Sequence, residues 1–414
     1  MYYLAFDVAR RTHECLLLDE EDQVLWRLAI RSNRTGFDEL AERLRDVDPQ
    51  AVVAGLEASG PYWQTLHLWL LRWKPARVIV LNPLQTKAFR NTNLRGSKTD
   101  RLDTRSIGQL LRFTHRTLSQ AYVPEDRQDA IRQISRLKVE LTQQRASELV
   151  RLDGVLSVVF PEFTELFKLT TKTARALLLR WPTPEALRKD ASAEEVAALL
   201  RQTSRGHVGV QKAEALLRVA QDSTGVPDPH DGRSVVIRSV LAVIELLEEQ
   251  IDTLGERIEE LLEGEQLETA SLLGSLPGFG TGTVHTWVAE LPPIERFKAK
   301  NGAERLAAAI GIDAKLKESG RYAGRVKMSK RGNRYMRRAI LMAARTAARC
   351  DPQCRAILLR HQNRGKHYNV AISHVARKLV HIAYSVLLNK TPYELPAGYR
   401  LGVTEEPDLA VSGA

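Results

Sequence analysis

The amino-acid sequence predicts a mixed α/β domain at the N-terminus, followed by a chain that is almost entirely helical. Short apolar runs bounded by polar turns alternate with helically spaced apolar residues up to about residue 116. Beyond that point the spacing of three and four residues that is typical of helices prevails. With 414 residues, of which 43% are hydrophobic, the chain is long enough for two or three domains with buried cores.

Strands and helices alternate in a definite order in the first domain. The expected elements are the strands Tyr2–Val8, His13–Leu18 and Val24–Ile30, the helix Gly36–Leu44, the strand Ala51–Leu56, the helix Tyr62–Trp73 and the strand Arg77–Leu81. A further helix is expected to open near residue 100. This order is that of the RNase H-like fold, in which the first and fourth strands lie side by side at the centre of the sheet.

Four carboxylates stand out in this domain. Asp7 and Glu57 lie in apolar runs, where a carboxylate is costly unless a charged partner satisfies it. Asp100 and Asp103 are three residues apart, so they share one face of the expected helix, for which Thr99 is the expected N-cap. Such oxygen ligands can hold two Mg²⁺ ions, about 4 Å apart, for phosphodiester chemistry. Mn²⁺ is an alternative ion, and a solvated helix start is the simpler interpretation of the Asp100 pair taken alone.

Cations flank the acidic residues on both sides. The cations expected to contact a phosphate backbone are Lys87, Arg90, Arg95, Lys98 and Arg105. A merely solvated basic face is the alternative. The whole chain has 61 Lys and Arg against 50 Asp and Glu, a net charge of +11, which favours a polyanionic partner.

Composition also bounds the cellular setting. The three cysteines form no CxxC pair and no disulfide framework, as expected in a reducing cytosol. The sequence has no leader peptide pattern and no apolar run of about 18 residues, so no membrane span is expected. We expect a cytoplasmic protein associated with the nucleoid.

The middle of the chain has the pattern of paired helices. The expected seam, with alternating steps of four and three, consists of Val240, Ile244, Leu247, Ile251, Leu254, Ile258 and Leu261. The helical stretch Ala130–Leu156 could be its antiparallel partner, with short helical pieces between them in residues 157–235. Pairing within one chain and pairing between two chains both remain open, and we favour a helical hairpin that also contacts another protomer.

A glycine-rich turn and a basic loop follow the seam. Gly278 and Gly280 lie between two expected helices, as in helix-hairpin-helix elements that hold nucleic acid through backbone amides, although an ordinary helix connection would look similar. Ser319 could be a nucleophile stabilised by surrounding cations, and Ser329 is an equally basic rival. The cations of this loop are Arg321, Arg325, Lys327, Lys330 and Arg331.

Several motifs occur in an order that resembles one protein family. They are Phe6-Asp7-Val8, Glu57 to Tyr62, Val80 to Pro83, Lys98 to Asp103, Leu276 to Gly280, Ser319-Gly320 and Ser329 to Arg334. Together they resemble the DEDD transposases of the insertion-sequence one-ten family, which are bridge-RNA-guided recombinases. The chain departs from that pattern at Glu318, where a glutamine is expected, and in the long segment 157–235.

The resemblance implies a domain plan and a mechanism. It implies a RuvC-like, RNase H-like domain in residues 1–122, a coiled-coil region in 123–268, a mostly helical transposase domain with a helix-hairpin-helix in 269–395 and a tail in 396–414. Asp7, Glu57, Asp100 and Asp103 would hold Mg²⁺, and Ser319 would form a phosphoserine intermediate with DNA. The implied partners are donor and target DNA, a structured guide RNA and further copies of the chain, as a dimer or a tetramer on DNA.

Three other classes compete with this interpretation. A RuvC-like, structure-specific endonuclease would use the same acids with metal-activated water and would not need Ser319. A sugar kinase with an actin-like fold shares the strand order but requires a second glycine-rich phosphate loop, which the sequence lacks. A nucleic-acid-binding protein with a dead site would bind without any dependence on metal.

Overall fold

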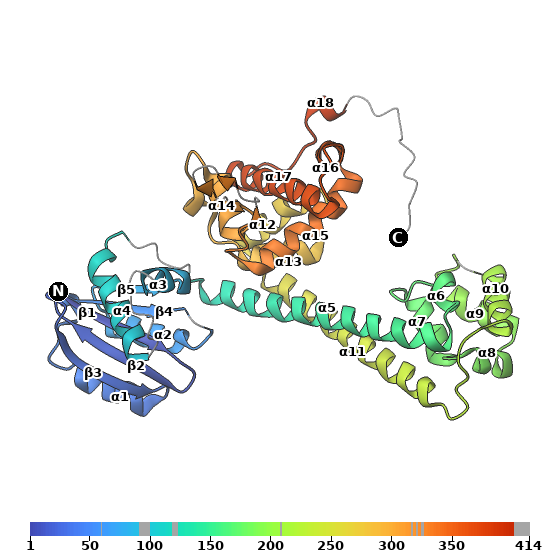
Figure 1. The fold of residues 1–414 in the computed structure, drawn as a ribbon, viewed down its shortest axis with the longest axis horizontal. Coiled ribbons are helices and arrows are strands. Elements are labelled where there is room, and N and C mark those ends of the chain that lie inside the picture. The colour runs from blue at the N-terminus through green and yellow to red at the C-terminus, as the bar shows by residue number, and fades with distance from the viewer. Residues whose placement is uncertain are drawn as a thin grey trace. The chain divides into compact units, whose positions relative to one another are not determined.

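The computed structural model describes residues 1–58, 60–90, 100–117, 123–207, 209–315, 318–319, 322–323 and 327–400 (Figure 1). Internal contacts divide the chain into two units, Met1–Val123 and Pro124–Ala414. In the described part of the chain, no helix is both long and apolar enough to span a membrane.

The first unit is built on a five-stranded mixed sheet with the order β3-β2-β1-β4-β5. Its strands are β1 (Tyr2–Val8), β2 (Thr12–Leu18), β3 (Val24–Arg31), β4 (Val52–Glu57) and β5 (Arg77–Leu81). β1 pairs antiparallel with β2 and parallel with β4, so the predicted neighbourhood of the first and fourth strands is confirmed. Each strand lies within two residues of its predicted bounds.

Helices cover both faces of this sheet. They are α1 (Arg34–Arg43), α2 (Trp63–Trp73), α3 (Pro83–Arg90) and α4 (Asp100–Thr114), with a 3₁₀ turn at Pro49–Ala51. Leu40 of α1 and Leu66 of α2 belong to the core on one face. Ile107 and Leu111 of α4 belong to the core on the opposite face. α4 begins at Asp100, where the sequence predicts a helix start.

Two long helices run antiparallel in the second unit, α5 (Asp126–Val159) and α11 (Gly232–Leu261) (Figure 1). Arg145 pairs with Glu248 at 3.1 Å, whereas Lys138, seven residues earlier, reaches Gly255, seven residues later. This register confirms the predicted antiparallel partner within one chain. Of the predicted seam, Val240, Ile244, Leu247 and Ile258 are buried, and Ile251, Leu254 and Leu261 are half-buried.

Five short helices lie between the two long ones in the sequence. They are α6 (Phe163–Leu166), α7 (Lys172–Arg180), α8 (Pro184–Asp190), α9 (Ala193–Thr203) and α10 (Val210–Gln221). They share a core with the adjoining ends of α5 and α11, to which Leu156 and Ile237 contribute. This shared core explains why α11 starts at Gly232, eight residues before the predicted seam.

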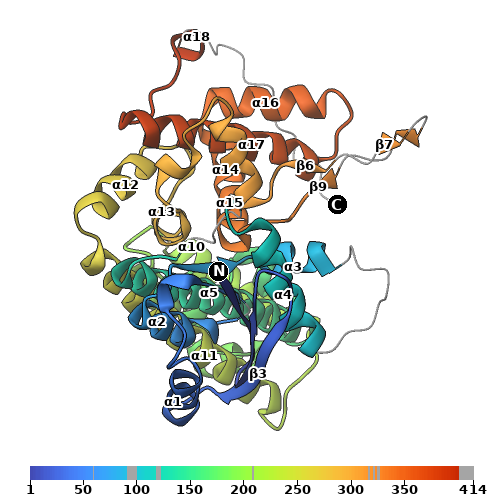
Figure 2. The ribbon, with the colours of Figure 1, turned by 90° about the vertical axis from the view of Figure 1, so that its left-hand side faces the viewer.

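The C-terminal part of the second unit is mostly helical, as predicted (Figure 2). Its helices are α12 (Gly264–Gly274), α13 (Thr281–Glu290), the 3₁₀ turn Ile294–Phe297, α14 (Gly302–Ile310), α15 (Arg334–Cys350), α16 (Pro352–Gln362), α17 (Tyr368–Asn389) and α18 (Ala397–Arg400). Four two-residue strands lie between α14 and α15: β6 (Ala314–Lys315), β7 (Glu318–Ser319), β8 (Tyr322–Ala323) and β9 (Lys327–Met328). Trp287, Ile340 and Leu379 are fully buried in the core that α13, α15 and α17 share.

Candidate catalytic and nucleic-acid sites

Asp7 and Glu57 lie at the carboxyl ends of two neighbouring parallel strands. β1 and β4 are in register through Phe6 and Leu56, and each carboxylate directly follows one of these paired residues. Both side chains are half-buried. The two acids therefore stand at the same level of the sheet, as the sequence predicted.

α4 covers the face of the sheet on which these carboxylates lie. Gly55, two residues before Glu57 and thus on the same face, is so close to α4 that an added Cβ would stand 2.5 Å from the Leu111 side chain. Ile107 is buried against this face, and Asp103 lies one helical turn before Ile107. The fold thus brings Asp103 to the side of the sheet that carries the other two acids.

The fit of a metal ion to this arrangement depends on the kind of donor and on its distance. All the candidate donors are carboxylate oxygens, the ligands that Mg²⁺ prefers. Within the part of the chain that the structure describes, no three Asp, Glu, His or Cys side chains come close enough to hold an ion. The side chain of Asp100 lies outside that part. The metal site of four carboxylates therefore stays a prediction, and the chemistry of its donors suits Mg²⁺.

Two further polar residues belong to this region, and sequence reasoning missed both. The hydroxyl of Thr86, which is 2% exposed in α3, donates a hydrogen bond to Oε2 of Glu57. Glu14 of β2 is paired directly opposite Asp7, so its carboxylate shares the same face. The alternation of Glu14 with Leu16 and Leu18 could have revealed it, whereas no sequence pattern marks Thr86.

The cations predicted around the acids have different surroundings. Lys87 is exposed on α3. Arg105 forms an ion pair with Asp22 at 3.1 Å, which holds α4 to the turn between β2 and β3, and contact of Arg105 with a phosphate stays a prediction. The side chain of Arg90 and the whole of Arg95 and Lys98 lie outside the described residues.

The glycine-rich turn between α12 and α13 is explained first by packing. Gly278 has φ +78°, and an added Cβ would stand 2.3 Å from the carbonyl oxygen of Ala343 in α15. Phe279 is buried beside it, edge-on to Trp287. The turn thus fits closely against α15. Contact of Gly278 and Gly280 with a phosphate stays a prediction.

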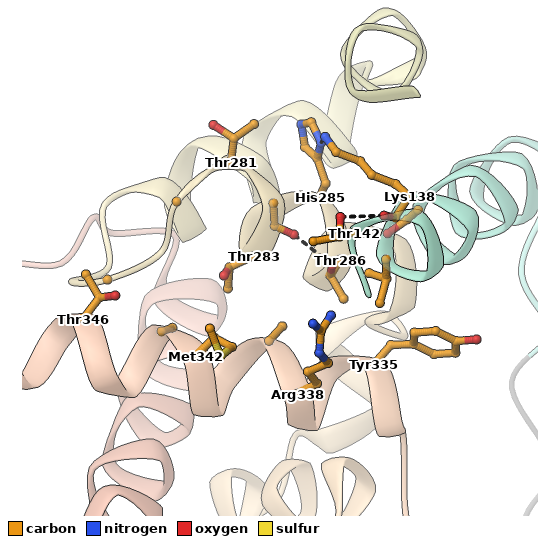
Figure 3. A pocket seen from close by; sticks show the side chains of 17 residues that line it. Lys138, Thr142, Thr281, Thr283, His285, Thr286, Tyr335, Arg338, Met342 and Thr346 are labelled. Carbon is orange, nitrogen blue, oxygen red and sulfur yellow. Dashed lines mark hydrogen bonds between the residues drawn. The ribbon is translucent and has the colours of Figure 1, made fainter. Parts of the chain in front are cut away.

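A pocket of about 450 Å³ opens beside this turn, between α5, α13 and α15 (Figure 3). Its cations are Lys138 of α5 and Arg338 of α15, and Thr281 and Thr283 add hydroxyl groups. No carboxylate lines it among the residues that the structure describes. The pocket therefore suits an anionic group.

A buried histidine orients the lysine of this pocket. Nζ of Lys138 lies 3.3 Å from Nδ1 of His285, and Nε2 of His285 lies 2.6 Å from a carboxylate oxygen of Glu259. Because an ammonium group only donates, Nδ1 must accept and Nε2–H must donate to Glu259, so the imidazole is neutral. Burial lowers the pKa of His285 and also that of Lys138.

The two candidate serines have different surroundings. Ser319 ends β7 and pairs with Tyr322 of β8, and β7 stands outside the helical core (Figure 2); the side chain of Ser319 lies outside the described residues. The hydroxyl of Ser329 donates to Asp313 and accepts from the backbone amide of Arg331 at 3.3 Å. Ser329 therefore connects two loop segments. Arg321 and Arg325 lie outside the described residues, whereas Lys327, Lys330 and Arg331 are exposed.

The segment that follows Ser329 is anchored to a buried carboxylate, a feature that sequence reasoning missed. Asn333 caps α15 by accepting hydrogen bonds from two backbone amides, and its Nδ2 donates to Glu290 at 2.6 Å. Arg136 of α5 donates to the same carboxylate at 2.8 Å and stacks over the ring of Tyr335. Acidic residues inside apolar helices such as α13 could have pointed to a buried partner.

Comparison with known proteins gives consistent relatives. A family model described as a transposase, of the DEDD and IS110 type, matches residues 4–161. A second model, described as the transposase IS116/IS110/IS902 family, matches residues 270–358. These matched ranges contain all four candidate acids and both candidate serines.

Two full-length relatives point the same way. A 42 kDa protein of insertion element IS900 from Mycobacterium paratuberculosis, described as uncharacterized, is 26% identical over 395 residues, which cover 94% of this chain and 96% of that protein. A 43.6 kDa protein of insertion element IS110 from Streptomyces coelicolor, likewise described, is 24% identical over 372 residues, 89% of each chain.

Proposed function

Because the chain belongs to the IS110 family of DEDD transposases, we propose that it cleaves and exchanges DNA strands with a serine nucleophile and Mg²⁺. The observation that supports this most directly is the position of Asp7 and Glu57 on neighbouring strands beneath α4, which carries Asp103. The strand order β3-β2-β1-β4-β5 is also the one expected of an RNase H-like, RuvC-like domain. We infer that the first unit has this fold.

The carboxylates would act together on the metal. In this proposal Asp7, Glu57, Asp100 and Asp103 hold Mg²⁺, which would stabilise negative charge on the attacking and leaving oxygens of the phosphodiester. The hydroxyl of Thr86 donates to Oε2 of Glu57 and would orient this carboxylate for the metal.

Ser319 would carry the covalent step. Its Oγ attacks the DNA phosphorus, a phosphorus–oxygen bond of the strand breaks, and the leaving oxygen takes up a proton. Attack by the hydroxyl of a second strand then releases the serine, so one phosphodiester is exchanged for another. The exposed cations Lys327, Lys330 and Arg331 in the same loop suit a phosphate near this serine. Ser329 has its hydroxyl occupied by Asp313 and Arg331, which favours Ser319.

A guide RNA and further protomers complete the proposal. Base pairing to a structured RNA would select the donor and target DNA, leaving the protein to contact backbone and shape. The acids of one protomer would act with the serine of another in a dimer or tetramer on DNA. The net charge of +11 suits such polyanionic partners.

A strand-transfer assay tests the proposal. It uses the full-length protein, Mg²⁺, donor and target DNA and the RNA from the flanking non-coding sequence, with trapping of covalent adducts. We expect Asp7→Asn to abolish cleavage, Ser319→Ala to abolish both adduct and exchange, and the matched variant Ser329→Ala to keep the adduct. Cleavage that persists in Ser319→Ala without an adduct would instead identify a RuvC-like nuclease that uses metal-activated water.

A further inference from the structure

The C-terminal helices carry an unusually unbalanced charge. Between Ser319 and Tyr393 the only carboxylate in the sequence is Asp351. Asp351 is 5% exposed and accepts hydrogen bonds from the backbone amide of Cys354 and the hydroxyl of Tyr393, at 2.8 and 2.9 Å. This carboxylate therefore takes part in a buried hydrogen-bond network. The many cations of α15, α16 and α17 consequently have no acidic partner from their own segment of the sequence.

Two histidines stack on each other at one end of this region. The rings of His361 in α16 and His374 in α17 have centroids 3.7 Å apart and planes inclined by only 2°. His361 is half-buried and His374 is exposed. The stacked pair thus lies at the surface, where the end of α16 packs against the start of α17.

Among the residues that the structure describes, the charges that act on this pair are all cationic. They come from Arg360 in α16, Arg364 and Lys366 in the loop that follows, and Arg377 in α17. None of the four forms an ion pair or a side-chain hydrogen bond with the described residues. Burial is the main cause that lowers the pKa of both histidines. The next causes are the neighbouring cations for His361, and for His374 the charge of His361 followed by Lys366 and Arg377, so the neutral form of both rings prevails at pH 7.

We propose that His361 and His374, together with Arg360, Arg364, Lys366 and Arg377, form a binding surface for the phosphodiester backbone of nucleic acid, and that binding protonates one ring of the pair. A phosphate supplies the negative charge that the cluster lacks and cancels the repulsion that disfavours an imidazolium. The protonated ring then donates a charge-assisted hydrogen bond to a phosphate oxygen. The identity of the partner as nucleic acid rests on the proposed function.

Binding measured against pH tests this proposal. Fluorescence anisotropy of full-length protein with a labelled single-stranded RNA, and separately with a labelled DNA duplex, is followed from pH 8 to pH 6 at fixed ionic strength and without divalent metal. Each proton taken up strengthens binding by at most about tenfold per pH unit. We expect wild-type affinity for at least one of the two probes to rise several-fold as the pH falls. The probe that responds identifies the nucleic acid that occupies the surface.

Matched variants assign the effect to this cluster. His361→Asn with His374→Asn should flatten the pH dependence, whereas His230→Asn, an exposed histidine in the loop before α11, should keep it. The double variant Arg364→Gln with Lys366→Gln changes two exposed residues and should weaken binding at every pH. The number of counterions released on binding, measured from the slope of log affinity against log salt concentration, should fall by about two. An unchanged slope in the double histidine variant, or unchanged affinity in the charge variant, would overturn the proposal.

The outcome is separable from that of the proposed reaction. The assay contains no divalent metal and can be repeated with Asp7→Asn, so loss of cleavage leaves the result intact. Failure of the binding prediction would likewise leave the chemistry of Asp7 and Ser319 untouched.

Discussion

Nη2 of Arg136 lies 2.8 Å from Oε2 of Glu290, and this ion pair joins the long helix α5 to the end of α13. The Glu290 side chain is only 2% exposed, whereas that of Arg136 is 40% exposed. The hydrogen bond to Glu290 raises the pKa of Arg136. Because Asn333 donates to the same carboxylate, the loop that carries the candidate serines is tied to the helix pair through one buried acid.

Arg136→Leu is predicted to destabilise the second unit more than Glu290→Leu. The first change leaves a buried carboxylate without its cation, bonded to Asn333 alone among the described residues, which costs about 3 kcal/mol, whereas the second leaves a guanidinium that water can still reach. Urea midpoints of the variants measure the difference. The control is Arg127→Leu, whose partner Glu263 is 64% exposed, so its loss should cost under about 1 kcal/mol. Equal effects of the two changes would show that burial of Glu290 does not set the strength of the pair.

Gly278→Ala and Gly282→Ala are predicted to change stability in opposite directions. A Cβ at Gly278 meets the Ala343 carbonyl oxygen at 2.3 Å and requires a strained φ, so the folded state should lose about 2 kcal/mol or more. Gly282 lies within α13 with open space around it, so alanine should stabilise the helix by up to about 1 kcal/mol. Thermal unfolding of both variants measures this, and a stable Gly278→Ala protein would contradict the close approach to α15.

His285 is predicted to make the second unit less stable in mild acid. Burial holds its pKa in the folded state below the ordinary value of 6.5, so the unfolded chain binds more protons there. His285 should therefore leave the free energy of unfolding unchanged well above pH 6.5. As the pH drops from 6.5 towards the pKa of His285 in the folded state, the free energy of unfolding should fall.

Urea midpoints measured from pH 8 to pH 5 test the role of His285. His285→Gln should give a shallower decline below pH 6.5 than the wild type. His207→Gln, at an exposed position in the loop between α9 and α10, should decline as the wild type does. Identical profiles for His285→Gln and the wild type would show that protonation of this ring is not linked to folding.

The sequence predicts elements well where one periodic signal dominates. Strand β1 is recognisable as a short apolar run because both of its faces are buried, and the seam from Val240 to Ile258 is recognisable because burial on one face of a helix imposes a period on the residues. The sequence does not predict the start of α11 at Gly232. The first turns of α11 pack on α7 and the other short helices between α5 and α11, and contacts between distant segments leave no local period in the sequence.

The residues of the candidate site likewise divide into those that the sequence predicts and those that it does not. Asp7 and Glu57 could be placed together because the strand order fixes their neighbourhood. Thr86 and Glu290 could not, because their roles depend on tertiary hydrogen bonds to residues far away in sequence. The structure also gives a reason for glycine at position 278 that the sequence does not. The sequence shows that a turn is needed there, but not that Ala343 lies against it.

Thr86→Val is predicted to weaken metal use by the proposed catalytic site without unfolding the first unit. Valine has the shape of threonine but lacks the hydroxyl that donates to Glu57, so this carboxylate loses its fixed orientation. The Mg²⁺ concentration for half-maximal cleavage should rise by about tenfold or more. Saturating Mg²⁺ should restore most of the rate, since Thr86 acts only through Glu57.

Two comparisons make this last prediction specific to the hydrogen bond. Thr86→Ser keeps the hydroxyl and should require nearly the wild-type Mg²⁺ concentration, although it loses a buried methyl group. Thermal unfolding without metal separates a lost hydrogen bond from a misfolded domain. If Thr86→Val and Thr86→Ser raise the Mg²⁺ requirement equally, packing of α3 and not the hydroxyl positions Glu57.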